Sequence, residues 1–251
     1  MMMNMVQAIN SALAVEMEAD GSVVVLGEDV GAVGGVFRAT DGLMKRFGSE
    51  RVIDTPLAES LIAGMATGMA MAGLRPVAEI QFMGFSYLAL NMIISHTARM
   101  RNRSRGTYTV PMVMRMPYGA GVKALEHHSE STESMFVQIP GIKVVVPSTP
   151  REAKGLLISS IRDPDPVIFL EPTRSYRLFK EEVEEGAFTI PLGEARTVRE
   201  GDDVTVVCWG AMMPLTMEAV DAAEGEGISC DVIDLRTLSP MDPDAVIRSV
   251  R

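Results

Sequence analysis

The side chain best placed to do chemistry is Glu59, a single carboxylate inside an apolar stretch that runs from Pro56 to Gly73. After Pro56 the stretch is apolar or small on every side of a helix, which is typical of a buried helix. A buried carboxylate needs a partner, or its pKa rises. Two interpretations are open: a first-turn glutamate favoured by the helix dipole, or a functional carboxylate whose proton affinity has been raised.

A second candidate is the segment 126–131, the densest cluster of titratable and hydroxyl groups in the chain. It contains two adjacent histidines, His127 and His128, which are possible metal ligands. Neighbouring residues in an extended segment point to opposite sides, so we expect only one of them to face a site. His96 stands alone on a predicted helix, where a structural role is the favoured interpretation.

Acidic residues also follow a predicted strand at residues 22–26, as Glu28 and Asp29. In parallel α/β sheets ligands bind at the carboxyl edge of the strands, so this is a candidate site. The glycines that come next, Gly31, Gly34 and Gly35, match neither the dinucleotide fingerprint nor the phosphate loop with its lysine.

The elements that must position these residues alternate between strand and helix. Apolar periodicity predicts helices at 5–19, 41–47, 86–101 and 150–162, besides one that Thr55 caps with Pro56 in its first turn. Strands are predicted at 22–26, 51–54, 75–81, 111–116, 143–146 and 167–170. This alternation predicts an α/β fold with a parallel, doubly wound sheet.

A polar, acidic stretch at 180–186 is the candidate linker to a second unit. We expect domains at residues 1–186 and 187–251. The second is predicted to hold strands at 204–208 and 228–235 and helices at 213–224 and 242–250. With only two convincing parallel strands it is below the minimum for an independent sheet, and we expect this α/β domain to be incomplete.

Composition narrows the classes of function. The chain has 251 residues with a net charge of −10, which argues against nucleic acid or an anionic membrane as the main partner. An arginine cluster at 99–105 is interpreted as a solvated or subunit-facing patch. Cys208 and Cys230 have no metal-ligand spacing and suggest a reducing, cytoplasmic setting. No apolar run is long enough to span a membrane.

Six motifs, in order along nearly the whole chain, resemble the beta subunit of the first component (E1) of 2-oxoacid dehydrogenase complexes, a group that includes the pyruvate, branched-chain and acetoin enzymes. They are residues 26–31 (LGEDVG), 54–59 (DTPLAE), 79–82 (EIQF), 128–131 (HSES), 146–150 (VPSTP) and 234–240 (DLRTLSP). The resemblance implies a thiamine-binding, transketolase-like pyrimidine domain followed by a transketolase C-terminal-like domain.

The resemblance also implies thiamine diphosphate as cofactor, shared with an alpha subunit that holds Mg²⁺ and the diphosphate. Glu59 matches the carboxylate that hydrogen-bonds the aminopyrimidine ring, and Phe85 the aromatic residue that stacks on it. Glu28 and Leu61 match positions lining that pocket. His128 matches the histidine that positions the lipoyl group and supplies a proton during acyl transfer. The implied assembly is an alpha2–beta2 heterotetramer that serves a lipoyl-bearing acyltransferase core.

A structural K⁺ is a further implication of the resemblance. Its oxygen ligands match Met112, Ser160, Ile161 and Asp163, with Asp165 nearby, and hard cations take such ligands. A plain helix-terminating turn explains the same residues equally well.

Several alternatives stay open. A transketolase-like or deoxyxylulose-phosphate-synthase-like enzyme shares the fold, but normally carries both cofactor halves on one chain. A catalytically inert structural subunit is the non-enzymatic alternative. The chain departs from some relatives at Leu88 and Asn91, where they carry carboxylates. The small residues Gly64 and Gly68 are expected to pack closely, against a partner subunit or within the core.

Overall fold

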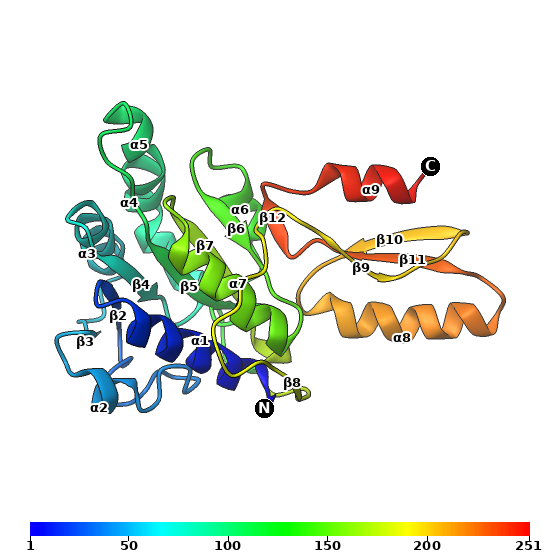
Figure 1. The fold of residues 1–251 in the computed structure, drawn as a ribbon, viewed down its shortest axis with the longest axis horizontal. Helices are drawn as coiled ribbons and strands as arrows, with labels where there is room; N and C mark the ends of the chain where they lie inside the picture. The colour runs from blue at the N-terminus through cyan, green and yellow to red at the C-terminus, as the bar shows by residue number, and fades with distance from the viewer.

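A seven-stranded sheet is the centre of the molecule, in a computed structural model that describes all 251 residues (Figure 1). Its order is β12-β6-β7-β5-β4-β2-β3, in which six strands are parallel and only the edge strand β12 is antiparallel. The strands are β2 (Val23–Gly27), β3 (Val52–Asp54), β4 (Arg75–Glu79), β5 (Val113–Tyr118), β6 (Lys143–Val145), β7 (Val167–Pro172) and β12 (Thr237–Ser239). This confirms the predicted parallel sheet.

Helices cover both faces of this sheet, which is why its central strands are apolar on both sides. Helices α1 (Met5–Ala19) and α7 (Pro150–Arg162) pack against each other over one face, with Val25, Val77 and Phe169 beneath them. Helix α3 (Glu59–Met71) and α4 (Leu90–Ser95) cover the other face, against Leu26 and Met114. Each face thus has its own apolar core.

Helix α7 begins where the sequence predicts, and Thr149 caps it by accepting a hydrogen bond from the Glu152 backbone N–H. The reciprocal bond of a capping box, from the Thr149 backbone N–H to the Glu152 side chain, is absent. The Glu152 side chain instead accepts from the backbone N–H of Ser148 at 3.1 Å. Its carboxylate is therefore directed toward the junction with the second unit.

The helix predicted at 86–101 is wrong in detail, because the chain is broken there into short pieces. These are the 3-10 turn η1 (Met83–Ala89), α4, η2 (Thr97–Arg99) and α5 (Met100–Arg103). The guanidinium groups of Arg99 and Arg103 donate to the carbonyls of Ile94 and Ser95. Those carbonyls end α4, so arginine side chains take the place of the next turn of backbone N–H donors.

The predicted linker at 180–186 is not a free tether. Strand β8 (Glu181–Glu182) pairs with β1 (Met2–Met3), and Val183 is fully buried. The Lys154 ammonium donates to the backbone carbonyls of residues 184 and 185. This connection is therefore fixed to the first unit by the N-terminus and α7.

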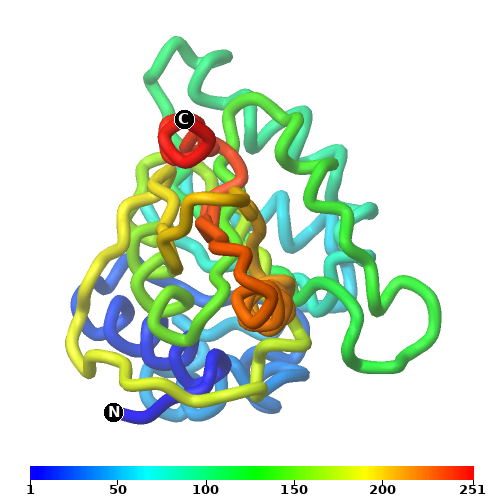
Figure 2. The backbone as a smooth tube through the Cα atoms, turned by 90° about the vertical axis from the view of Figure 1, so that its right-hand side faces the viewer, coloured from blue at the N-terminus to red at the C-terminus, as the bar shows by residue number.

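The second unit is a three-stranded sheet with one helix on each side (Figure 1). Strands β10 (Val204–Cys208) and β11 (Cys230–Asp234) are parallel, as predicted, and β9 (Arg196–Arg199) pairs antiparallel with β11. Helices α8 (Met212–Gly225) and α9 (Pro243–Ser249) flank them. Neither β9 nor β12 was predicted. Strand β12 comes from the second unit but pairs with β6 at the edge of the first sheet. Seen end-on in Figure 2, the second unit stands in front of the first.

The remaining elements are short. They are α2 (Leu43–Phe47), α6 (Glu133–Val137) and η3 (Thr173–Ser175). No helix in the structure combines the length and the apolar character that crossing a bilayer requires.

Candidate active site

The candidate site residues lie at one edge of the first sheet, beyond the carboxyl ends of four adjacent strands, β5, β4, β2 and β3. Glu28 follows β2, Glu59 begins the helix after β3, Phe85 lies in η1 after β4, and His128 is in the loop after β5. This is the edge at which ligands bind in parallel α/β sheets.

Glu59 is the first residue of α3 and only 7% exposed. Its Oε2 atom is buried and has no hydrogen-bond partner. A buried carboxylate oxygen without a donor is costly, so an atom left in this state points to a donor that the chain itself does not supply.

The start of α3 differs from the prediction. The cap residue is Ala58, which makes no side-chain cap, and Thr55 and Pro56 precede the helix. The Thr55 N–H instead donates to the carbonyl of Gly27 at 2.9 Å, so β-type pairing with β2 continues past Asp54 and delays the first helical turn. As a result Glu59, rather than Pro56, stands at the positive end of the helix dipole.

Glu28 is half-buried, and the negative charge of Glu59 acts on it. Burial raises the pKa of Glu28 above its usual range, and the charges of Asp29 and Glu59 raise it further. The candidate site thus has two carboxylates, of which Glu28 takes up a proton more readily than an exposed glutamate.

The aromatic side of the site is formed by Phe82, Phe85 and His128. The His128 ring is edge-on to both phenylalanines, with ring centroids 4.6 Å from Phe82 and 5.1 Å from Phe85. Its Nδ1 lies 3.0 Å from the carbonyl oxygen of Glu126. If Nδ1 carries the proton to that carbonyl, Nε2 is the basic nitrogen. His127 faces elsewhere, toward Tyr87 with ring centroids 6.3 Å apart.

Leu61 is placed differently from the other candidates. It is 46% exposed on α3, in the same exposed region as Leu57 and Leu88, which are 71% and 66% exposed. The hydroxyl of Ser60 donates to the Leu88 carbonyl and so joins α3 to η1. Leu61 therefore lies at the outer rim of the site, rather than among the buried residues at its floor.

The oxygens matched to a structural K⁺ already have protein donors. Both carboxylate oxygens of Asp163 accept from the Lys143 ammonium, at 2.6 and 2.7 Å, and Arg101 pairs with Asp165 at 2.6 Å. The carbonyl of Ile161 accepts from Arg75 at 2.8 Å. Those of Met112 and Ser160 accept from backbone N–H groups. The Asp163 carboxylate thus has a cationic partner in Lys143, while each carbonyl oxygen keeps a second lone pair, and the K⁺ site stays a prediction.

The sequence analysis missed a buried ionic network next to this site. Arg115 of β5 is fully buried and pairs with Glu79 of β4 at 2.7 Å and, through two nitrogens, with Glu171 of β7 at 2.6 and 2.9 Å. Tyr176 donates to Glu171 at 2.5 Å. Charged residues inside strands buried on both faces were the available signal, since such charges are almost always paired.

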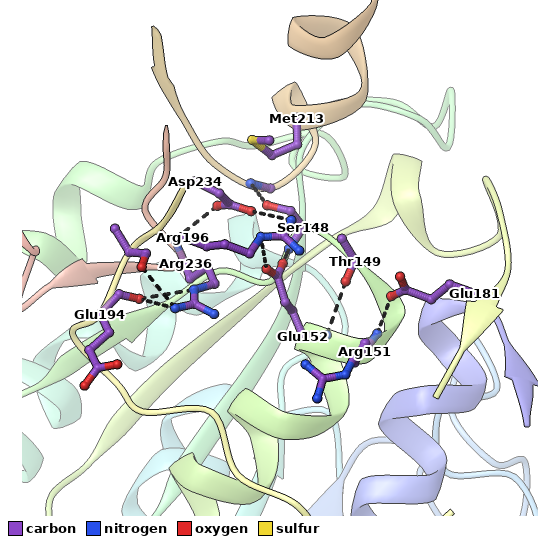
Figure 3. Close-up of polar contacts among 12 residues, drawn as sticks. Ser148, Thr149, Arg151, Glu152, Glu181, Glu194, Arg196, Met213, Asp234 and Arg236 are labelled. Atoms are coloured by element: carbon purple, nitrogen blue, oxygen red, sulfur yellow. Dashed lines mark hydrogen bonds and ion pairs between the residues drawn. The ribbon is translucent and has the colours of Figure 1, made fainter. Parts of the chain in front are cut away.

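A second missed cluster lies where the two units meet (Figure 3). Glu152 of α7 and Asp234 of β11 are 2% and 0% exposed, and both face the half-exposed Arg196 of β9. The distances are 3.2 Å to Glu152 and 3.9 Å to Asp234. Burial, and then the charge of Glu152, raise the pKa of Asp234 to about 7.

The comparisons with known proteins agree with this architecture. Residues 1–178 match the family described as transketolase, pyrimidine binding domain, and residues 193–251 match transketolase, C-terminal domain. A solved structure of a split-gene transketolase, an inactive beta4 tetramer, superposes with a TM-score of 0.81 over 99% of this chain and 76% of that one, at 22% identity. The fold is therefore that of the transketolase-like, two-domain α/β proteins.

Curated relatives narrow the class further. The chain is 55% identical to the pyruvate dehydrogenase E1 component subunit beta of Acholeplasma laidlawii, over 98% of this chain and 76% of the relative. It is 54% identical to the subunit of the same name from Bacillus subtilis strain 168, over 99% and 76%. The chain belongs to the family of 2-oxoacid dehydrogenase E1 beta subunits, which are components of thiamine-dependent enzymes.

Proposed function

We propose that this chain, together with an alpha subunit, catalyses the oxidative decarboxylation of a 2-oxoacid and the transfer of the acyl group to a lipoyl group of an acyltransferase core. Pyruvate is the first substrate to test, because relatives about half identical to this chain are named for it. The observation that carries the proposal is the buried, unpartnered oxygen of Glu59 at the carboxyl edge of the sheet.

The chemistry of Glu59 fits the pyrimidine half of thiamine diphosphate. A ring nitrogen at Oε2 gives this buried oxygen the partner it lacks, and a proton held between the two is shielded from water by the apolar wall of α3 and η1. Glu28, whose pKa is raised, is a second group able to hold a proton there. When bound, thiamine diphosphate supplies the electron sink for loss of CO₂.

His128 has the properties expected of a residue that meets the acyl acceptor. Its ring is half-buried and rests on Phe85, the aromatic residue proposed to cover the pyrimidine. Its Nε2 is then the nitrogen that carries a proton and delivers it to the thiolate that forms as the S–S bond of the lipoyl group opens during acyl transfer. Glu59 and His128 thus divide the work between decarboxylation and acyl transfer.

The decisive test is Glu59→Gln in the complex co-expressed with its alpha subunit. We expect decarboxylation, followed with an artificial electron acceptor, to fall roughly 100-fold or more because the amide cannot hold the proton. The matched control is Glu50→Gln, an exposed glutamate on the surface, which should retain wild-type rates. A Glu59→Gln enzyme with wild-type rates contradicts the mechanism.

The division of roles is tested with His128→Ala. We expect acylation of a lipoyl domain to lose more activity than decarboxylation with the artificial acceptor, because only the first reaction uses the imidazole. His127→Ala is the control, since that ring faces Tyr87. Equal losses in both assays refute the assignment.

Failure of thiamine diphosphate with Mg²⁺ to stabilise the alpha–beta complex against heat favours the inert structural subunit instead.

A further inference from the structure

The loop that carries His128, residues 119–131 (the His128 segment), is hydrogen-bonded at its two ends and exposed in the middle. At its start, the Thr173 hydroxyl lies 3.1 Å from the carbonyl oxygen of Tyr118 and 3.0 Å from that of Gly119. At its end, the Tyr87 hydroxyl donates to Glu130 Oε2 at 3.1 Å. Residues 120–127 between these points are all exposed, and the green segment around residue 125 stands out from the body in Figure 2.

The end of the His128 segment makes an unusually close approach to η1. A side-chain carbon placed on Gly84 would overlap the carbonyl oxygen of His127 and lie 2.8 Å from Cγ of Glu130. The backbone N–H of Thr132 also points at the sulfur of Met83, at 3.4 Å. The absence of a side chain at Gly84 therefore lets the segment rest directly on the turn that carries Phe85.

The turn η1 thus contacts two side chains at the end of the His128 segment, those of His128 and Glu130. Phe82 and Phe85 hold the His128 ring, while Tyr87 holds the Glu130 carboxylate two residues further on. The backbone adds a third contact, from Gly119 N–H to the Glu130 carbonyl at 2.8 Å, which closes the base of the loop. The exposed middle makes no side-chain hydrogen bond to η1, and its one ring contact there is that of His127 with Tyr87, so we expect the hydrogen bond at Glu130 to decide where His128 lies.

We propose that Tyr87 and Glu130 are positioning residues, which hold the His128 segment against η1 and so place His128 over Phe85. The catalytic consequence of this contact rests on the proposed function, whereas the contact between Tyr87 and Glu130 is independent of it. Loss of the Tyr87–Glu130 hydrogen bond lets the segment leave the turn, which displaces His128 but leaves Glu59 in place on α3. Acyl transfer then weakens while decarboxylation continues.

The first experiment is hydrogen–deuterium exchange on the complex with the alpha subunit, followed by mass spectrometry of peptides covering 119–132. Tyr87→Phe and Glu130→Ala should each speed exchange there roughly 2- to 10-fold, the factor for one hydrogen bond, with the peptides of α3 unchanged. Glu130→Gln keeps an acceptor oxygen and should restore the wild-type rate. The matched controls are Tyr108→Phe and Glu126→Ala, whose side chains are exposed and make no recorded hydrogen bond. Unchanged exchange in Tyr87→Phe and Glu130→Ala overturns the proposal.

The second experiment measures kinetics in the same variants. We expect the KM for a lipoyl domain to rise in Tyr87→Phe and Glu130→Ala, while kcat with an artificial acceptor stays within about 2-fold of wild type. The double variant Tyr87→Phe with Glu130→Ala should be no worse than either single change, because both remove one interaction. Additive losses overturn the proposal. A wild-type complex inactive on every 2-oxoacid defeats the proposed function alone, since the exchange experiment still reports on the contact.

Discussion

Two sets of buried or half-buried carboxylates lie at the same edge of the first sheet, and they differ in the cations that neutralise their charges. Glu79 and Glu171 share the guanidinium of Arg115, with every distance under 3 Å. Glu59 and Glu28 follow the neighbouring strands β3 and β2, the charge of Glu59 raises the pKa of Glu28, and Glu59 keeps an unpartnered oxygen. The same sheet thus contains one closed set, whose carboxylates share a buried cation, and one open set, whose carboxylates have no cation beside them.

The cluster where the two units meet is intermediate between these extremes. Glu152 and Asp234 are as buried as Glu79, but their only cation, Arg196, is half-exposed and 3.9 Å from Asp234. Figure 3 shows both carboxylates directed toward it. Burial is the largest cause of the rise in the pKa of Asp234 to about 7, the charge of Glu152 is the next, and Arg196 offsets only part of both.

The largest expected effect is on the closed set. Arg115→Leu leaves two buried carboxylates without their cation and should cost about 3–5 kcal/mol of unfolding free energy, a large part of a typical total. The measurement is chemical denaturation of the purified complex, or the soluble yield if the protein does not accumulate. Arg46→Leu, which removes the exposed pair with Glu18, is the control and should cost no more than about 1 kcal/mol. Similar losses in both variants would mean that burial does not separate the two kinds of pair.

The open set should respond in the opposite direction. Glu59→Gln removes a buried charge that has no cation, so we expect Tm to stay constant or rise while activity is lost. Thermal unfolding of the cofactor-free complex is the measurement, with Glu50→Gln again as control. A fall in Tm of several degrees would show that Glu59 has a structural partner after all, and would remove the contrast between the two sets.

The cluster at the junction predicts a pH dependence. The pKa of Asp234 is about 7 in the folded chain against 3.8 for an ordinary aspartate, so the folded state binds this proton more tightly. Its contribution to stability is therefore full below the unfolded value, declines as pH rises, and is lost by about pH 7. Asp234→Asn removes that dependence, so its Tm advantage over wild type should be small at pH 5 and grow toward pH 8.

This gain is expected to be a few degrees, since each kcal/mol corresponds to about 2–4 °C in a chain of this length. Asp244→Asn, an exposed residue on α9, serves as the control and should show the same Tm difference at both pH values. A Tm difference for Asp234→Asn that is flat between pH 5 and pH 8 would mean that Arg196 neutralises the cluster fully.

The smallest effect is expected at a half-exposed pair. Glu16 of α1 is 4% exposed by its side chain, but its partner Arg162 of α7 is 47% exposed, at 2.7 Å. Solvent screens such a pair, so Glu16→Gln should cost only about 0.2–1 kcal/mol. The measurement is the denaturation midpoint of Glu16→Gln, compared with that of Arg115→Leu. A loss of stability as large as that of Arg115→Leu would show that the burial of an ion pair does not determine its contribution to stability.

Local sequence patterns predict much of this fold and less of its ionic structure. The parallel sheet follows from apolar runs, and the position of Glu28 and Glu59 at one edge follows from their places after strands. Arg115 could not be paired from the sequence, because its partners lie 36 and 56 residues away. The late start of α3 likewise depends on a hydrogen bond between Thr55 and Gly27 that no local pattern encodes.

Strand β12 has a consequence for how the chain loses its structure. Its residues 237–239 come from the second unit but form the outer strand of the first sheet, beside β6. The backbone carbonyl of Arg236 extends that pairing to Val146. Unfolding of the second unit removes β12 and exposes the edge of β6, so the unfolding of this unit is coupled to that of the larger sheet. We expect one heat-absorption peak in calorimetry, with the two units unfolding cooperatively rather than in succession.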